Sequence, residues 1–345
     1  MPHLLQNRLS FISLLLAFAF LLTSRASAEL VWTPQTGWQT EGGVFAGGNS
    51  SNAQSALKFM NKARAAEEKD SDGTAIKYYK RVTKKYPDSV YAAEAFYRLG
   101  KIRLDRKQYS KAFEALQVVA VQYPSTTHFD EIIGLQYHIG SSLLDGARGR
   151  VWGIFPGFQH RDKGIEYLKT TIFEAPYSDY SPIAMMSVAR GYQYFKETAE
   201  AIDALDQMVN SFPQHPLTPE AYLYLGLAHA SLVEGPYYDQ ASTRDAITFY
   251  EDFMILFPSD NNVASAEKGL IDMKKVLAES KMKIADFYFK RRSNYKAARV
   301  FYNEAITVYP DSDIAKLARE RLTEVDAAVA KSTEPQPKKK RFYFF

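Results

Sequence analysis

Apolar positions recur along this chain in one frame, which appears six times. In each copy an alanine or glycine is followed after four, three and four residues by mostly apolar or aromatic side chains, and then by proline. The copies begin at Ala75, Ala112, Gly164, Ala201, Ala246 and Ala298 and close at Pro87, Pro124, Pro176, Pro213, Pro258 and Pro310. Because steps of three and four residues stay on one helical face, the frame predicts six amphipathic helices. Proline disfavours helix at the residue before it, so each helix should end there.

A second helix precedes each of these, and the pair is clearest in the second copy of the frame. There the pattern predicts a first helix from about Val90 to Asp105 and a second from about Tyr109 to Gln122. Glycine follows an apolar residue at the same place in three first helices, in Leu99-Gly100, Ile139-Gly140 and Leu225-Gly226. Because glycine has no side chain, it lets the two helices approach closely. Repeated pairs predict an all-α solenoid, which binds partners more often than it catalyses.

Irregular spacing predicts where the array departs from its repeat. Residues 146–160 form an insertion in the third copy, and the first helix of the sixth copy should run from about Val263 to Lys290. Residues 311–330 predict a closing helix, because their apolar positions form one stripe. The pairs Ser181-Pro182 and Thr218-Pro219 predict a capping hydroxyl followed by proline at two helix starts.

The second copy resembles the tetratricopeptide repeat. Counted back from Pro124, the residues on its signature positions are Phe96, Leu99, Gly100, Ala112, Leu116 and Val119. Arg103 departs from the pattern, since an aromatic residue is usual there. The resemblance implies a tetratricopeptide-repeat α-solenoid of about six helix pairs plus a closing helix, which we place at residues 51–330.

The first residues of the chain predict an export signal. Arg8 precedes an apolar stretch at residues 9–23, and Ala26-Ser27-Ala28 is a small-residue cleavage site. We therefore expect residues 1–28 to be removed by cleavage after Ala28. An uncleaved membrane anchor is the alternative, although the stretch is short for a span of ~20 residues.

Two flanking segments have the composition of irregular structure. Residues 29–50 are rich in glycine and polar residues and predict an extended arm. Residues 331–345 predict a flexible tail, in which four cations at 338–341 are followed by four aromatic residues. Such a tail suits contact with a membrane surface. Docking of the tail in a groove, of this chain or of a neighbour, and a disordered tail without a partner are the alternatives.

Composition narrows the function classes. The sequence has no cysteine, which excludes disulfides, thiolate metal sites, cysteine nucleophiles and a lipid anchor on cysteine. The net charge of +4 comes from the two ends, so the body is slightly acidic and a poor match for nucleic acid. The six histidines form no HExxH motif or paired metal spacing, and the sequence has no GxSxG, P-loop or GxGxxG motif. We expect no catalytic residue, metal or cofactor.

The last repeats resemble the outer-membrane protein assembly factor BamD family. Four segments carry the resemblance: residues 239–246 (DQASTRDA), 277–279 (LAE), 285–292 (ADFYFKRR) and 295–298 (YKAA). The resemblance implies a non-catalytic periplasmic scaffold, peripheral to the outer membrane of a Gram-negative bacterium. It also implies that the C-terminal repeats bind a BamA-like barrel insertase and that the N-terminal repeats receive unfolded barrel proteins.

This sequence departs from that family in three respects. Relatives typically carry a lipidated cysteine and five repeats, whereas here there is no cysteine, a sixth copy is present and residues 146–160 are inserted. The alternative function is a periplasmic repeat adaptor that coordinates cell-wall synthesis or division, similar to CpoB. That family has an N-terminal coiled coil and fewer repeats.

The first helices of the repeats should line a concave groove. Its predicted side chains mix apolar and cationic types: Leu57, Met60, Arg64, Tyr97, Lys101, Leu104, Met186, Arg190 and Tyr194. Such a mixture suits a peptide that offers an aromatic group and a carboxylate. An ordinary solvated groove is the alternative.

Two further groups are candidates for partner contact. Trp152, Phe155 and Phe158 form an apolar loop among arginines, which is typical of a partner or membrane surface unless the loop folds back over the array. All three tryptophans lie outside the repeat frame, so core packing of the array does not explain them. The second group is Asp239, Thr243 and Arg244, which match the family pattern. The alternative to partner contact is a structural role. In that case Thr243 would cap a helix that begins near Arg244, and Asp239 would pair with Arg244.

Overall fold

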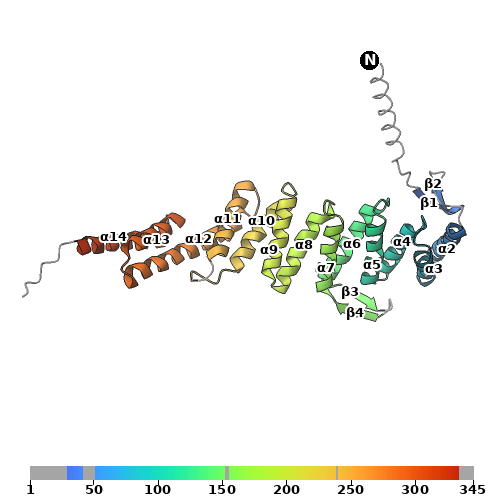
Figure 1. The fold of residues 1–345 in the computed structure, drawn as a ribbon, viewed down its shortest axis with the longest axis horizontal. Coiled ribbons are helices and arrows are strands. Elements are labelled where there is room, and N and C mark those ends of the chain that lie inside the picture. Colours follow the sequence, from blue (N-terminus) through green and yellow to red (C-terminus); the bar gives the residue numbers. More distant parts are fainter. Residues whose placement is uncertain (1–28, 42–50, 152–154, 238–239, 334–345) are drawn as a thin grey trace, which may run out of the picture. The chain divides into compact units, whose positions relative to one another are not determined.

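The computed structural model describes residues 29–41, 51–151, 155–237 and 240–333 (Figure 1). The chain divides into two compact units, an N-terminal unit that ends at Tyr180 and a C-terminal unit that begins at Ser181. The predicted export signal lies outside the described residues, and so does the predicted tail from residue 334 on, whereas residues 331–333 belong to the closing helix. Along the described residues, none of the helices combines the length and apolar composition needed to cross a membrane.

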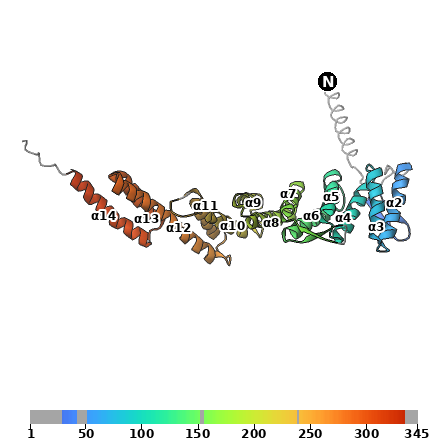
Figure 2. The ribbon, with the colours of Figure 1, turned by 90° about the horizontal axis from the view of Figure 1, so that it is seen from below.

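In its described residues the N-terminal unit contains two hairpins and six helices. Its elements are β1 (Glu29–Thr33), β2 (Gly37–Glu41), α2 (Ser51–Glu67), α3 (Asp72–Lys85), α4 (Ala92–Asp105), α5 (Tyr109–Gln122), α6 (Phe129–Leu144), β3 (Arg148–Val151), β4 (Phe155–Gln159) and α7 (Arg161–Glu174). Each helix packs against the next, as Figures 1 and 2 show.

The C-terminal unit is entirely helical in its described residues. Its elements are α8 (Tyr180–Phe195), whose first residue closes the N-terminal unit, α9 (Thr198–Ser211), α10 (Thr218–Ser231), α11 (Gln240–Leu256), α12 (Val263–Asp286), the π-helix η1 (Phe287–Arg291), α13 (Tyr295–Val308) and α14 (Asp313–Thr333). From α9 to α14, consecutive helices are again packing partners. The predicted all-α tetratricopeptide fold is confirmed by this succession of helix pairs with its closing helix.

The repeat frame forms the core between paired helices. In the first copy, Ala75, Tyr79 and Val82 are all fully buried. Burying one large apolar side chain contributes about 1.5–3 kcal/mol, so the frame supplies a substantial stabilising term in every repeat. The helices end as the closing prolines predict: α5 stops at Gln122, and the amide of Tyr123 donates to the carbonyl of Val119 at 2.9 Å before Pro124.

Close approach of the paired helices explains the glycines of the first helices. A Cβ atom built on Gly100 would lie 2.7 Å from a methyl carbon of Leu116 on the partner helix. The equivalent glycines are in the same situation. A Cβ atom built on Gly140 would lie 2.8 Å from Leu168, and one built on Gly226 would lie 2.7 Å from Tyr250. Real Cβ contacts are not this short, so the interpretation of these glycines as close-packing positions is confirmed.

The predicted capping role of the two hydroxyls before proline is wrong. Helix α10 begins at Thr218 itself, and the Thr218 hydroxyl donates to the carbonyl of Phe212 at 2.6 Å, so it ties the helix start to the preceding turn. Helix α8 begins at Tyr180, so Ser181 lies inside its first turn and is fully buried. The Thr218 hydroxyl therefore bonds to the preceding turn instead of capping its helix.

Residues 29–41 form a hairpin, where the sequence suggested an extended arm. Strands β1 and β2 are antiparallel and place Trp32 opposite Trp38. Trp38 is only 3% exposed within the core cluster of α2, α3 and α4, and its amide donates to Oδ1 of Asn61 at 3.1 Å. The expectation that core packing does not explain the tryptophans is therefore wrong for Trp38. Gly37 turns the chain with φ +72°, a value that favours glycine.

The insertion forms a hairpin, and the long helix ends in a π-helix. Strands β3 and β4 form a second antiparallel hairpin, and the amide of Arg150 donates to the carbonyl of Lys107 in the loop between α4 and α5 at 2.9 Å. The long first helix of the sixth repeat is α-helical to Asp286 and continues as the π-helix η1. Tyr288 in η1 stacks on Phe301 of α13, with ring centroids 5.6 Å apart.

Candidate functional site

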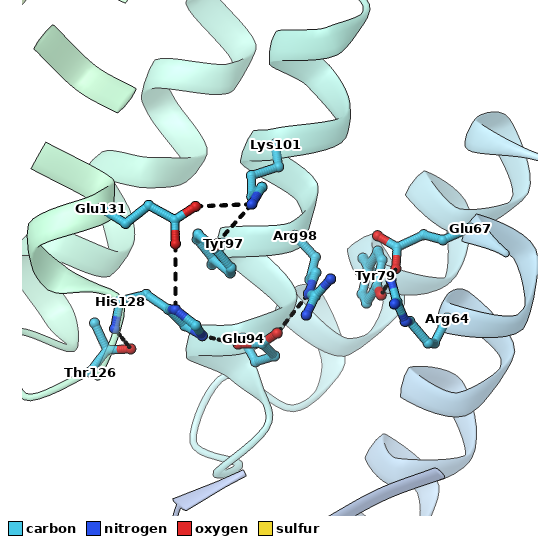
Figure 3. Close-up of polar contacts among 10 residues, drawn as sticks. All are labelled: Arg64, Glu67, Tyr79, Glu94, Tyr97, Arg98, Lys101, Thr126, His128 and Glu131. Atoms are coloured by element: carbon cyan, nitrogen blue, oxygen red, sulfur yellow. Dashed lines mark hydrogen bonds and ion pairs between the residues drawn. The ribbon is translucent and has the colours of Figure 1, made fainter. Parts of the chain in front are cut away.

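Charged and aromatic side chains meet on the first helices of the N-terminal unit (Figure 3). We call this group the polar ladder and define it by Glu94, Tyr97, Arg98, Lys101, His128 and Glu131. Four members lie on α4, one precedes α6 and one lies in the first turn of α6. Glu94 and Glu131 occupy the same place after the closing prolines of consecutive repeats. The repeat geometry therefore brings equivalent carboxylates into one network.

Glu94 is the buried centre of the polar ladder. Its side chain is 6% exposed, and its two oxygens have separate partners. The Arg98 Nε atom donates to Oε1 at 2.7 Å, and His128 Nε2 lies 3.2 Å from Oε2. Burial disfavours the charge of Glu94, but the hydrogen bonds from His128 and Arg98 outweigh it and hold its pKa below the usual value. Glu94 is therefore an ionised group inside the repeat interface.

His128 joins the buried carboxylate to the exposed end of the ladder. Its ring stacks on Tyr97, with centroids 4.2 Å apart and an interplanar angle of 7°. The hydrogen bond to Glu94 raises the pKa of His128. On its other side, Nδ1 lies 3.8 Å from Glu131. Lys101 completes the ladder, because its ammonium lies 2.9 Å from Glu131 and donates to the Tyr97 hydroxyl at 3.1 Å.

A second charged pair lies on α2 beside the first. Arg64 and Glu67 form an ion pair of 2.7 Å, and the Tyr79 hydroxyl donates to the same Glu67 oxygen at 3.0 Å. Burial and the Glu67 charge raise the pKa of Tyr79, so its hydroxyl stays protonated as a donor. The Arg64 guanidinium also lies over the Trp32 ring, 4.5 Å from its centroid. This arrangement ties the β1–β2 hairpin to α2.

The structure brings several predicted groove residues together but buries others. Arg64, Tyr97 and Lys101 are side chains of the network in Figure 3. Tyr97 is only 3% exposed, however, and Met60 is fully buried. Both side chains pack inside the hydrophobic clusters between helices, so the expectation that they project into an open groove is wrong.

The remaining groove candidates divide in the same way. Leu57 is half-buried and borders a shallow cavity of about 580 Å³ on α2, while Leu104 packs against the core cluster of the second repeat. In the C-terminal unit Met186 is 5% exposed, which also contradicts its expected place in the groove. Arg190 is exposed and donates to the Ser187 hydroxyl at 3.1 Å, and Tyr194 is 63% exposed. Some predicted groove residues are buried because the first helix of a repeat packs both on its own partner helix and on the next repeat.

Sequence reasoning missed three members of the ladder as functional candidates, namely Arg98, His128 and Glu131. The signal was the i, i+4 spacing of Glu94 and Arg98 together with the repetition of the carboxylate at residue 131. Because each cation of the ladder already has a carboxylate partner, a peptide carboxylate can bind there only by replacing one. The main role of the ladder is therefore structural, because it holds α4 against α6.

Arg244 borders an open cavity in the C-terminal unit. The cavity has a volume of about 520 Å³, with Leu277 and Lys281 of α12 on one side and Val300 and Glu304 of α13 on another. Lys281 and Glu304 form an ion pair of 2.6 Å. Arg244 is exposed and, among the described residues, has no ion-pair partner. We call this feature the Arg244 cavity.

The other two members of that predicted contact group lie elsewhere. Thr243 is fully buried within the first turn of α11, which begins at Gln240, so it does not cap a helix that starts near Arg244. Asp239 lies outside the described residues. Of the apolar loop, Trp152 also lies outside them, whereas Phe155 and Phe158 stand on β4 and are 58% and 85% exposed. Among the described residues, no three His, Asp or Glu side chains are grouped for metal binding.

Comparison with known proteins identifies two matching family models. The model described as "YfiO: Outer membrane lipoprotein" matches residues 160–340, which is about half of the chain. A tetratricopeptide-repeat model matches residues 59–89 and 94–126.

Curated relatives agree with the first model. The outer membrane protein assembly factor BamD of Caulobacter vibrioides is 22% identical over 48% of this chain and 51% of its own length. BamD of Xylella fastidiosa (strain 9a5c) is 24% identical over 42% of this chain and 52% of its own length. The chain thus spans about half the length of the curated relatives that it matches.

Solved structures match less closely. The C-terminal part of a TPR repeat-containing protein from Cytophaga hutchinsonii has a TM-score of 0.32 at 19% identity, covering 76% of this chain and 87% of that one. The fold assignment rests on the helix pairs themselves and on the repeat model. With the YfiO model matched across the entire described part of the C-terminal unit, the chain belongs to the YfiO/BamD family.

Proposed function

We propose that this protein is a non-catalytic periplasmic scaffold of the machinery that assembles β-barrels in the outer membrane. One observation carries the proposal: the family match at residues 160–340 covers the unit in which Arg244 borders an open cavity. The matched relatives are named outer membrane protein assembly factors. A scaffold needs an accessible surface of mixed chemistry, and the Arg244 cavity is such a surface.

The Arg244 cavity is the proposed contact with the barrel insertase. Its walls combine apolar side chains such as Leu277 and Val300 with a cation that has no partner among the described residues. Protein interfaces favour arginine surrounded by apolar area, because the guanidinium can form several hydrogen bonds while its stem packs. The Lys281–Glu304 pair fixes one wall of the cavity, so its shape is held by α12 and α13 before a partner arrives.

The N-terminal unit is the proposed receiver of unfolded barrel proteins. The surface around Leu57 offers a cavity of mixed apolar and polar lining on α2, and Lys101 offers a half-exposed cation at the end of the polar ladder. A substrate carboxylate would displace Glu131 from Lys101, because that pair is open to solvent on both sides. Exchange of one exposed ion pair for another costs little, which suits transient substrate binding.

Charge reversal at Arg244 tests the insertase contact. The tagged chain is crosslinked in its own cell envelope, and the recovered proteins are identified by mass spectrometry. We expect the wild-type chain to recover a barrel insertase. Arg244→Glu should lower that recovery by about tenfold, because a negative charge then stands where the proposed contact has a cation. Circular dichroism should show unchanged helicity, since Arg244 is exposed.

Lys268→Glu is the matched control, because Lys268 is an exposed cation on α12 that does not border the Arg244 cavity. The control should leave insertase recovery unchanged. An equal loss in both variants would refute the assignment of the contact to this cavity. Recovery of peptidoglycan synthases or division proteins without an insertase would refute the assembly function and favour the wall-synthesis adaptor.

A further inference from the structure

A second cavity lies beside the β3–β4 hairpin of the N-terminal unit. It has a volume of about 340 Å³ and forms where the hairpin meets the start of α5 and the start of α7. We call it the hairpin pocket and define it by the side chains that carry its chemistry: Lys107, Lys111, Arg150, Phe158, His160 and Lys163. It assembles residues from three sequence regions around the inserted segment.

The hairpin pocket concentrates positive charge without a balancing carboxylate. Four of its lining residues are lysine or arginine, and none of its lining residues is Asp or Glu. Among the residues that the structure describes, none of the four cations takes part in an ion pair. Asp162, exposed in the first turn of α7, does not line the pocket. Like charges gathered in this way repel each other unless an anion lies between them.

The backbone adds to the positive potential of the pocket. Helix α5 begins at Tyr109 and has no acidic residue in its first turn and no side-chain cap at Gln108. The first amides of a helix lack partners within the helix, and the helix dipole favours an anion beside them. Tyr109, Ser110 and Lys111 from this turn all line the pocket. The first turn of α5 therefore lies at the same cavity as the four cations.

The walls of the pocket are fixed. The hairpin is bound to the α4–α5 loop by the hydrogen bond from the Arg150 amide to the Lys107 carbonyl, at 2.9 Å. Lys107 has a left-handed backbone with φ +55°, as do Asp70, Lys196 and Ser293 at the equivalent turns of other repeats, so this conformation belongs to the repeat fold.

An exposed aromatic group stands at the edge of the pocket. Phe158 lines the cavity and is nevertheless 85% exposed, and Phe155 on the same strand is 58% exposed. Cations beside exposed aromatic side chains are typical of surfaces that contact a membrane, where the cations meet headgroups and the aromatic rings enter the interface. A pocket for a free anion has no need of exposed phenylalanine.

From this combination we propose that the hairpin pocket binds the phosphate of an anionic phospholipid, with Phe158 entering the bilayer interface beside it. The pocket supplies Lys107, Lys111, Arg150 and Lys163 to the phosphate oxygens, together with the first amides of α5. The site is separate from the Arg244 cavity, so it stands or falls independently of the insertase contact. It gives a chain without cysteine a way to contact a membrane surface.

Vesicle binding tests the site. The exported form from Glu29 is mixed with vesicles of phosphatidylcholine, with or without phosphatidylglycerol, and bound protein is measured by sedimentation. In every variant Lys338, Lys339, Lys340 and Arg341 are replaced by Gln, so that the tail does not contribute. We expect binding to phosphatidylglycerol vesicles, reduced by about 25-fold in Lys111→Gln with Lys163→Gln, since each cation near an anionic surface contributes about a fivefold effect.

A matched pair controls for general charge. Lys77→Gln with Lys84→Gln removes two exposed cations from α3 of the same unit and should leave binding unchanged. Phe158→Ser should weaken vesicle binding and leave the net charge intact. An equal loss in the pocket pair and the control pair would overturn the proposal in favour of non-specific attraction, and so would an absence of vesicle binding.

Titration with inorganic phosphate separates the two sources of the anion. If the pocket binds a phospholipid, calorimetry with phosphate alone should show weak or no binding, while vesicle binding depends on Phe158. Tight phosphate binding that is lost in the pocket pair, together with vesicle binding that is unchanged in Phe158→Ser, would overturn the lipid assignment in favour of a free phosphate.

Discussion

The polar ladder and the hairpin pocket use the same side-chain types within one unit, yet the chain supplies the counter-charge in only one of them. In the ladder, Arg98 lies 2.7 Å from Glu94 and Lys101 lies 2.9 Å from Glu131. In the hairpin pocket, four cations line a cavity in which no lining residue is a carboxylate. A cation paired by its own chain mainly stabilises the fold, whereas an unpaired group of cations indicates an external anion.

The largest expected effect breaks the ladder at its centre. Glu94→Ala removes the buried acceptor and leaves Arg98 and His128 without their partner, which should lower the free energy of unfolding by about 3 kcal/mol. Urea unfolding followed by circular dichroism measures the change. Glu94→Gln keeps an acceptor in the same place and should cost less. Equal stability of wild type and Glu94→Ala would show that the ladder is not structural.

Packing at the ladder helix gives the next effect. Gly100→Ala places a methyl group 2.7 Å from Leu116 and should cost about 1–3 kcal/mol through overpacking. Gly73→Ala is the control, because a Cβ atom there has nothing within 4 Å in the first turn of α3. That substitution should be neutral or stabilise the helix by about 0.5–1 kcal/mol. Thermal unfolding of the two variants measures both outcomes.

The ladder should also make stability depend on pH. The hydrogen bond to Glu94 raises the pKa of His128 above its ordinary value of 6.5. The stabilisation from the charged ring is therefore complete below pH 6.5 and is lost as the pH rises through the higher pKa of the folded state. Urea unfolding at several pH values from about 5.5 to about 9 should show this fall. A His128→Gln variant that keeps the same fall would assign it to another group.

The exposed end of the ladder should matter less. Lys101→Gln removes an ion pair in which both side chains are more than 40% exposed, and it should cost about 0.5 kcal/mol. The loss should shrink in high salt, because exposed pairs are screened. A salt-independent loss of several times this size would mean that Lys101 acts mainly through its hydrogen bond to Tyr97.

The smallest expected effect on stability comes from removing cations of the hairpin pocket. Lys111→Gln with Lys163→Gln should change the free energy of unfolding by less than about 0.5 kcal/mol, since neither cation has an ion-pair partner among the described residues. The same urea measurement as for Glu94→Ala makes the two regions directly comparable. A loss as large as that of Glu94→Ala would remove the distinction between paired and unpaired cations.

The repeat array could be predicted in detail because its signals are local. The frame placed α5 at Tyr109–Gln122, and the close-packing glycines Gly100, Gly140 and Gly226 followed from their register. The long helix of the sixth repeat was placed almost to its end, where η1 replaces the last α-helical turn. The YfiO/BamD resemblance was likewise carried by short segments of the last repeats.

The candidate site was only partly predictable. Arg244 was recognised and is exposed at a cavity, whereas Met60, Tyr97 and Met186 were expected in a groove and are buried. The difference is that a helical period shows which residues share a face but not which neighbouring helix covers that face. The insertion also became a hairpin whose pocket joins residues far apart in sequence, from Lys107 to Lys163.

The sequence by itself determined the repeated helix pairs, the ends of the helices and the family, because 3.6-residue periodicity, proline and glycine act within a few residues. Only the tertiary structure decided that Trp38 is a core residue, that Glu94 has its partners inside the chain, and that the cations beside the hairpin have none among the described residues. Charge pairing and burial depend on distances between helices, and those distances exist only after the repeats have stacked.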